Sequence, residues 1–153
     1  MLGTLLSGCN NSEVSEFTNV NNNIESEIKI KSKDNEYKCK IFHTPEGLNT
    51  VTFSYPKNLE GFTISRNCGK YEVVQKELQG EYIKDPLPED SEIRKLMDIL
   101  DTLNREESGF NLKSEEEGEK TFVGNESEVV LDKKGNIVSI SLKNPEAEIE
   151  FER

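Results

Sequence analysis

The chain contains no tryptophan, one histidine and three cysteines in 153 residues. Without tryptophan it lacks the usual stacking platform for sugars, and seven Phe and four Tyr must supply the large core side chains. Hydrophobic residues make up only 33% of the chain, which predicts a single domain with a thin core. No apolar run approaches the roughly 20 residues that a membrane-spanning helix needs.

Basic residues are scarce relative to acidic ones. The sequence has 19 Lys and Arg against 30 Asp and Glu, a net charge of -11. Such a chain repels nucleic-acid phosphates and anionic lipid headgroups, and no basic stripe offsets the repulsion. We therefore expect no nucleic-acid binding, and we expect any membrane contact to come from a covalent anchor.

Motifs for catalysis and cofactors are also missing. We find no phosphate-binding loop, dinucleotide fingerprint or zinc-ligand spacing, so the sequence predicts neither a cofactor nor a metal site. A nucleophilic device would have to use His43, but its place at a strand end beside a turn favours an ordinary residue at the domain surface. Acids are abundant, so a cell-wall hydrolase using two of them remains the alternative function. The acidic run Glu115–Glu117 favours a solvated turn.

The first nine residues end in a pattern with chemical meaning. Leu6-Ser7-Gly8-Cys9 fits the bacterial lipobox, in which small residues enter a signal-peptidase cleft and the cysteine thiol receives diacylglycerol. The alternative is an ordinary apolar N-terminus with a buried cysteine. A signal peptide also needs a basic start and a longer apolar stretch, so we expect Met1 to lie inside a longer signal. We therefore predict a residual signal segment at 1–9.

The next residues, 10–23, are rich in Asn, Ser and Glu and too poor in apolar residues to pack, which predicts a flexible tether between membrane and domain. Two cysteines remain after Cys9. Cys39 alternates with apolar neighbours and Cys68 lies in a turn, so we expect two free thiols, with a disulfide between them as the alternative in an oxidising compartment.

From Ile24 onward, apolar and polar residues alternate with period two, which predicts antiparallel strands with one buried and one wet face. The apolar members are Ile24, Ile28 and Ile30; Tyr37, Cys39 and Ile41; Val51, Phe53 and Tyr55; Phe62 and Ile64; Val138, Ile140 and Leu142; and Ala147, Ile149 and Phe151. We also predict a turn over 66–70, one strand over 71–78 and a hairpin turn over 132–136.

One helix is predicted, from about Ser91 to Arg105. Apolar residues recur there at helical spacing, Asp90 or Ser91 suits the N-cap, and Ser108-Gly109 would end it. Strands, one helix and strands again define an α+β domain over 24–153: a curved antiparallel sheet, or half-barrel, with the helix on its concave face.

Eight side chains of the sheet and helix could line a ligand cavity, although filling of the core is the favoured interpretation. They are Phe53, Tyr55, Phe62, Ile64, Ile93, Leu96, Met97 and Leu100.

Parts of the sequence resemble a known family. The residues that carry the likeness are Thr44-Pro45-Glu46-Gly47, Val51–Ile64, Leu87-Pro88 before the helix, and Val130–Ile137. The chain resembles the LolA/LppX-like bacterial lipoproteins. It resembles more closely the small lipoproteins of Firmicutes, including the clostridial spore-germination lipoproteins. The resemblance implies a half-open barrel plugged by helices. It also implies binding of acyl chains or docking of a wall amidase.

The sequence thus predicts an extracytoplasmic lipoprotein held to the cell membrane through Cys9. We expect a non-enzymatic binding or accessory module whose ligand is a protein of the cell envelope or an acyl chain in the half-barrel.

Overall fold

The computed structural model describes residues 23–75, 78–82, 87–88, 91–103, 109–124 and 126–152. The predicted signal segment, Cys9 and nearly all of the predicted tether lie outside these residues. Everything described belongs to one antiparallel sheet, one helix of more than a single turn and their connections.

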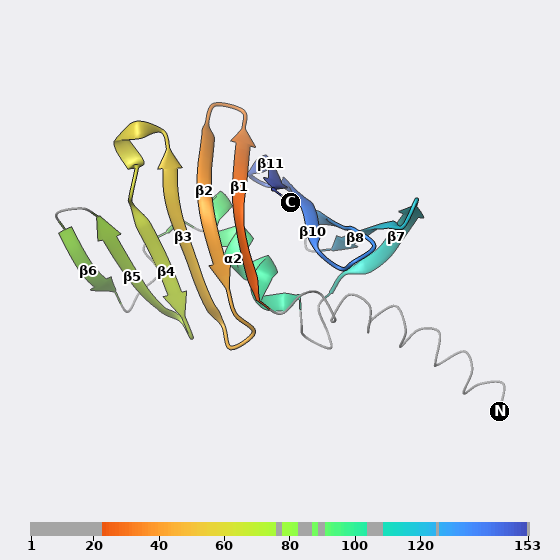
Figure 1. The fold of residues 1–153 in the computed structure, drawn as a ribbon, viewed down its shortest axis with the longest axis horizontal. Helices are drawn as coiled ribbons and strands as arrows, with labels where there is room; N and C mark the ends of the chain where they lie inside the picture. Colours follow the sequence, from red (N-terminus) through yellow and green to blue (C-terminus); the bar gives the residue numbers. More distant parts are fainter. Residues whose placement is uncertain are drawn as a thin grey trace.

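The sheet has eleven strands in the order β6-β5-β4-β3-β2-β1-β11-β10-β9-β8-β7. Its first wing comprises β1 (Ile24–Ser32), β2 (Glu36–His43), β3 (Leu48–Tyr55), β4 (Thr63–Asn67), β5 (Lys70–Gln75) and β6 (Leu78–Tyr82). Its second wing comprises β7 (Asn111–Glu116), β8 (Glu119–Gly124), β9 (Ser127–Leu131), β10 (Ile137–Lys143) and β11 (Glu146–Phe151). β11 returns to pair with β1, which joins the wings, while β6 and β7 remain as far-apart edges of a curved, unclosed sheet (Figure 1).

Alternation along each strand places the apolar side chains on one face. In β1 the buried Ile28 and Ile30 lie opposite Phe151 and Ile149 of β11, so the buried face continues across the join between the wings. The intervening Lys29 belongs to the wet face. The predicted period-two strands that begin at Ile24, Glu36, Leu48 and Glu146 are confirmed in this way.

The buried residues of helix α2 (Glu92–Thr102) belong to the same hydrophobic core cluster as those of the strands. Its Ser91 N-cap oxygen accepts a hydrogen bond from Arg94 N, as the sequence predicted for Asp90 or Ser91. The buried helix residues are Ile93, Leu96, Met97, Ile99 and Leu100. An isolated helix of eleven residues is marginal in water, so contact with the sheet supplies most of its stability. The predicted end at Arg105 lies outside the described residues. A single 3-10 turn, η1 (Lys57–Leu59), follows β3.

Several predictions about strands were wrong. The stretch predicted as one strand over 71–78 is split into β5 and β6, which pair with each other. The predicted turn over 66–70 is shorter, because Arg66 still belongs to β4 and Lys70 to β5. The strand β7 was missed, and the predicted turn over Glu115–Glu117 begins only after Glu116.

Two β-bulges change which side chains face the core. On β3, the register shifts between Cys39–Phe53 and Lys38–Tyr55, so Tyr55 lies opposite an outward-facing lysine and is 48% exposed. On β10, the shift between Ile137 and Ser139 buries Ile137 in place of the predicted Val138.

Candidate functional site

Most of the predicted cavity residues come together between the sheet and α2. Leu96 and Met97 have no exposed surface, Leu100 is 2% exposed, and Phe53, Ile64 and Ile93 are also buried. Side chains with no accessible surface leave no water-sized space beside them, so this group fills the core in the described conformation.

The remaining two predicted cavity residues are not part of the fully buried group. Phe62 is partly buried and packs beside Phe53, with ring centroids 6.0 Å apart. Tyr55 lies outside the core, and the Lys38 ammonium is 5.8 Å from its ring centroid. Tyr55 therefore belongs to the wet face of the sheet.

A polar cluster joins the sheet to α2 beyond this core. The prediction that His43 lies at the domain surface was wrong, because this side chain is only 2% exposed. His43 Nδ1 lies 2.7 Å from Asn49 Oδ1, and Asn49 Nδ2 donates to Asp101 Oδ1 at 2.8 Å. The second bond fixes the orientation of the amide, so His43 Nδ1 must carry the hydrogen that Asn49 Oδ1 accepts.

Arg66 forms the other half of the cluster. Its Nη1 donates to Asp98 Oδ1 at 2.7 Å and to Tyr71 Oη at 3.2 Å, while Nη2 donates to Asp101 Oδ2 at 2.6 Å. Burial alone would lower the pKa of Arg66, but hydrogen bonds to Tyr71 and the two carboxylates raise it overall. The guanidinium is therefore a permanent cation that fastens the helix to β4.

Sequence reasoning missed this cluster, although two signals were present. Arg66 follows the buried Ile64 by two residues, so strand alternation places it on the core face, where a cation needs a carboxylate partner. Asp98 and Asp101 are three residues apart on α2 and therefore project from neighbouring positions.

The cluster also bears on the alternative of a hydrolase. Asp98 and Asp101 both form ion pairs with the same residue, Arg66. Cys68 is exposed, and its Sγ contacts the Glu46 carbonyl at 3.9 Å; no contact with His43 is formed within the described residues. Asp98 and Asp101 are thus engaged in ion pairs that link α2 to β4.

The buried thiol of Cys39 is a core group. Burial raises the pKa of Cys39 to about 12 from an ordinary value of 9.0, and the thiol stays protonated at neutral pH. Since the folded state binds this proton more tightly than the unfolded chain, the contribution of Cys39 to stability is full below pH 9 and is lost as the pH rises toward 12. Cys39 and Cys68 are free thiols, as predicted.

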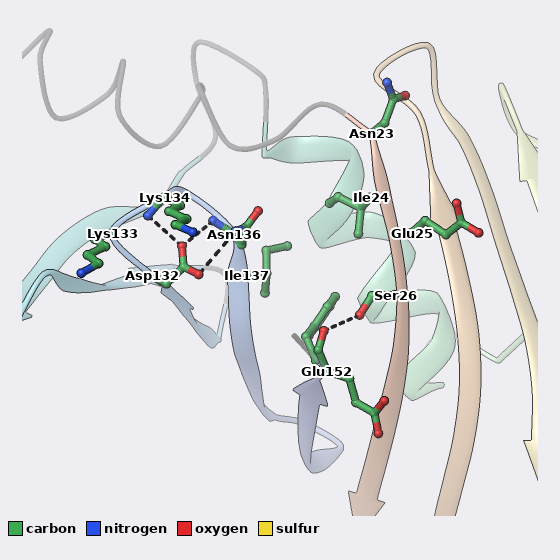
Figure 2. A pocket seen from close by; sticks show the side chains of 11 residues that line it. Asn23, Ile24, Glu25, Ser26, Asp132, Lys133, Lys134, Asn136, Ile137 and Glu152 are labelled. Atoms are coloured by element: carbon green, nitrogen blue, oxygen red, sulfur yellow. Dashed lines mark hydrogen bonds between the residues drawn. The ribbon is translucent and has the colours of Figure 1, made fainter.

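A pocket of about 570 Å³ opens where the two wings meet (Figure 2). β1 begins at Ile24, but it pairs with β11 only from Ile28 onward. One further backbone hydrogen bond joins Glu152 N to Glu27 O. The first residues of β1 and the turn between β9 and β10 therefore face each other across a space that β11 does not fill. The apolar lining of this pocket consists of Ile24, Ile137 and Phe151.

Hydrogen bonds to Asp132 hold the turn that forms one wall of the pocket. Asp132 Oδ1 accepts hydrogen bonds from Lys134 N at 2.8 Å and Asn136 N at 2.9 Å. Lys133 and Lys134 follow this aspartate with exposed side chains. Figure 2 shows both lysines on the hairpin side of the pocket, and Glu25 and Glu152 on the β1 side, away from them. Glu25 is moreover paired with Lys40 at 3.3 Å.

Two negative findings concern the described ranges of the chain. No group of three or more His, Cys, Asp or Glu residues is arranged there to hold a metal ion. Within the same ranges no helix has the length and apolar character needed to cross a membrane.

Comparisons with known proteins concern the fold. No protein-family model matches the chain, and no curated protein matches it. An uncharacterized conserved protein from Thermus thermophilus superposes with a TM-score of 0.56 at 14% identity, covering 95% of this chain and 87% of that one. A LolA superfamily protein from Nitrosomonas europaea superposes with a TM-score of 0.48 at 9% identity, covering 94% and 91% of the two chains. The first match indicates a shared fold, and the second TM-score is too low to establish one.

Proposed function

We propose that the protein is an extracytoplasmic lipoprotein, anchored through Cys9, that acts as a non-enzymatic binding module for an acyl chain or a similar apolar group with an acidic end. The observation that carries the proposal is the pocket between the start of β1 and the β9–β10 turn, with its apolar floor and lysine rim. The resemblance to LolA/LppX-like lipoproteins points to the same class of ligand.

The chemistry of the pocket suits an amphipathic molecule. Ile137 and Phe151 are core residues, so an apolar chain bound against them is removed from water where the core begins. Lys133 and Lys134 can pair with a carboxylate or phosphate at the rim. The volume of about 570 Å³ lies within the range usual for small-molecule sites.

The proposal includes a helix that occupies the concave face of the half-barrel. Complete burial of Leu96 and Met97 against the sheet supports this. With the interior filled, we assign the ligand to the pocket at the junction of the wings rather than to the space under the helix.

A titration of the full chain with a fluorescent fatty acid tests the binding function. We expect Lys133→Glu/Lys134→Glu to weaken binding about tenfold, which corresponds to roughly 1.4 kcal/mol. The matched control is Lys57→Glu/Lys70→Glu, which reverses two exposed charges outside the pocket and should leave affinity within about twofold. No binding by the wild-type protein, or equal losses in both variants, would contradict the proposed site.

The anchor is tested separately. Radiolabelled palmitate should enter the protein made from its full-length gene, and Cys9→Ser should abolish the label. Label that persists in the variant would refute lipidation at Cys9 without affecting the pocket.

A role as accessory to an envelope protein, which the resemblance to Firmicutes lipoproteins implies, is the other form of this proposal. Copurification of a wall amidase from native membranes would favour that form over an acyl ligand.

A further inference from the structure

A second pocket is lined by residues of the polar cluster. This amine groove, as we name it, has a volume of about 660 Å³ and opens between α2 and the turns that join β2 to β3 and β4 to β5. Its lining includes His43, Glu46, Arg66 and Asp98, whereas none of its residues lines the pocket assigned to the acyl ligand.

The donors on the groove wall are already in use. Arg66 directs its guanidinium at Asp98, Asp101 and Tyr71. Both oxygens of Asp101 are engaged as well, because Oδ1 accepts from Asn49 and Oδ2 accepts from Arg66. Arg66 and Asp101 therefore bind partners within the cluster and have little capacity left for a ligand.

The groups with remaining capacity are hydrogen-bond acceptors. In the neutral form of the His43 ring, the hydrogen lies on Nδ1 and is directed at Asn49, so Nε2 bears a lone pair. Nε2 has no partner among the described residues, although His43 is only 2% exposed and lines the groove. A buried polar atom without a partner is rare and calls for an explanation. The second oxygen of Asp98 and the exposed carboxylate of Glu46 are also without partners in the described part of the chain.

We propose that the amine groove binds a primary ammonium group, which donates hydrogen bonds to His43 Nε2 and to the carboxylates of Asp98 and Glu46. An ammonium has three donors and no acceptor, which matches three acceptors with remaining capacity among the residues that line the groove. A divalent metal fits less well, since no set of three ligating side chains is gathered among the described residues.

The single histidine makes a direct spectroscopic test possible. In the full chain labelled with ¹⁵N-histidine, n-butylammonium chloride should shift the Nε2 resonance in the direction of hydrogen-bond acceptance. The Nδ1 resonance should change less because its bond to Asn49 persists. n-Butanol and sodium chloride at equal concentration are the controls for the alkyl chain and for ionic strength.

Substitution of an exposed acid tests the carboxylate contribution without disturbing the core. Glu46→Gln should weaken butylammonium binding roughly two- to fivefold, as expected for one partly solvated ion pair. Glu60→Gln, an exposed acid outside the groove, is the matched control and should change nothing.

The source of the amine is distinguished by comparing butylammonium with the side chain of N-acetyl-lysine methylamide. Tighter binding of the lysine derivative would assign the groove to a protein partner, and tighter binding of butylammonium would assign it to a free amine. An Nε2 resonance that does not move at saturating amine, or that moves equally with butanol, would overturn the proposal. The fatty-acid titration is independent of either outcome.

Discussion

Leu96→Ala tests whether the space between sheet and helix is filled. Leu96 has no exposed surface and lies in the middle of the buried stripe of α2. Truncation to alanine removes three carbon atoms from the core, a loss of about 2.4 kcal/mol at roughly 0.8 kcal/mol for each buried carbon. The cavity that remains adds to this, so we expect a total of about 3–5 kcal/mol. This is a large part of the roughly 5–15 kcal/mol that stabilises a typical domain.

Urea denaturation of the full chain, followed by circular dichroism, measures this loss. Lys95→Ala is the control on the same helix, because its side chain is only half-buried, and it should cost less than about 0.5 kcal/mol. A loss below about 1 kcal/mol for Leu96→Ala would refute the filled core. It would indicate an open cavity under the helix, of the kind that a lipid carrier needs.

Three further predictions concern other parts of the molecule. Arg66→Met should lower the free energy of unfolding by about 2–3 kcal/mol in the same denaturation assay. This is less than for a fully buried ion pair, because Asp98, one of the two carboxylates bound to Arg66, is half exposed. An unchanged free energy of unfolding would show that the cluster does not stabilise the fold. In a Cys9→Ser background, iodoacetamide at pH 8 should label Cys68 in the native protein and Cys39 only in urea, as mass spectrometry will show; native labelling of both would contradict the buried thiol. Gly124→Ala should destabilise by about 1–3 kcal/mol, because its Cβ would overlap a neighbouring backbone carbonyl oxygen, and an unchanged midpoint in urea would refute that close approach.

The sequence predicted those strands whose alternation is regular. In β11, Ala147, Ile149 and Phe151 alternate with acids, and the structure buries all three. It failed where a strand lacks that pattern. β7 has a single apolar residue, Leu112, among six and is an edge of the sheet, so pairing with β8 rather than burial defines it. It also failed at Tyr55, because the period-two pattern of Val51, Phe53 and Tyr55 gives no sign of the bulge that exposes Tyr55.

The polar cluster shows a second limit of sequence reasoning. His43, Arg66 and Asp101 are far apart in the chain, and only the register of β2, β3 and β4 with α2 in place brings them together. The pocket between the wings depends in the same way on where β11 stops against β1. Both sites arise from tertiary arrangement, which a single sequence with no chemical motif does not reveal.

The most direct test of the proposed function is to locate a bound fatty acid on the full chain by ¹H–¹⁵N NMR. We expect the largest amide shifts at Ile24, Ile137 and the lysine turn of the pocket, with Leu96 and Leu100 of α2 little affected. Shifts concentrated on α2, or no shifts at saturating ligand, would contradict a binding site at the junction of the two wings.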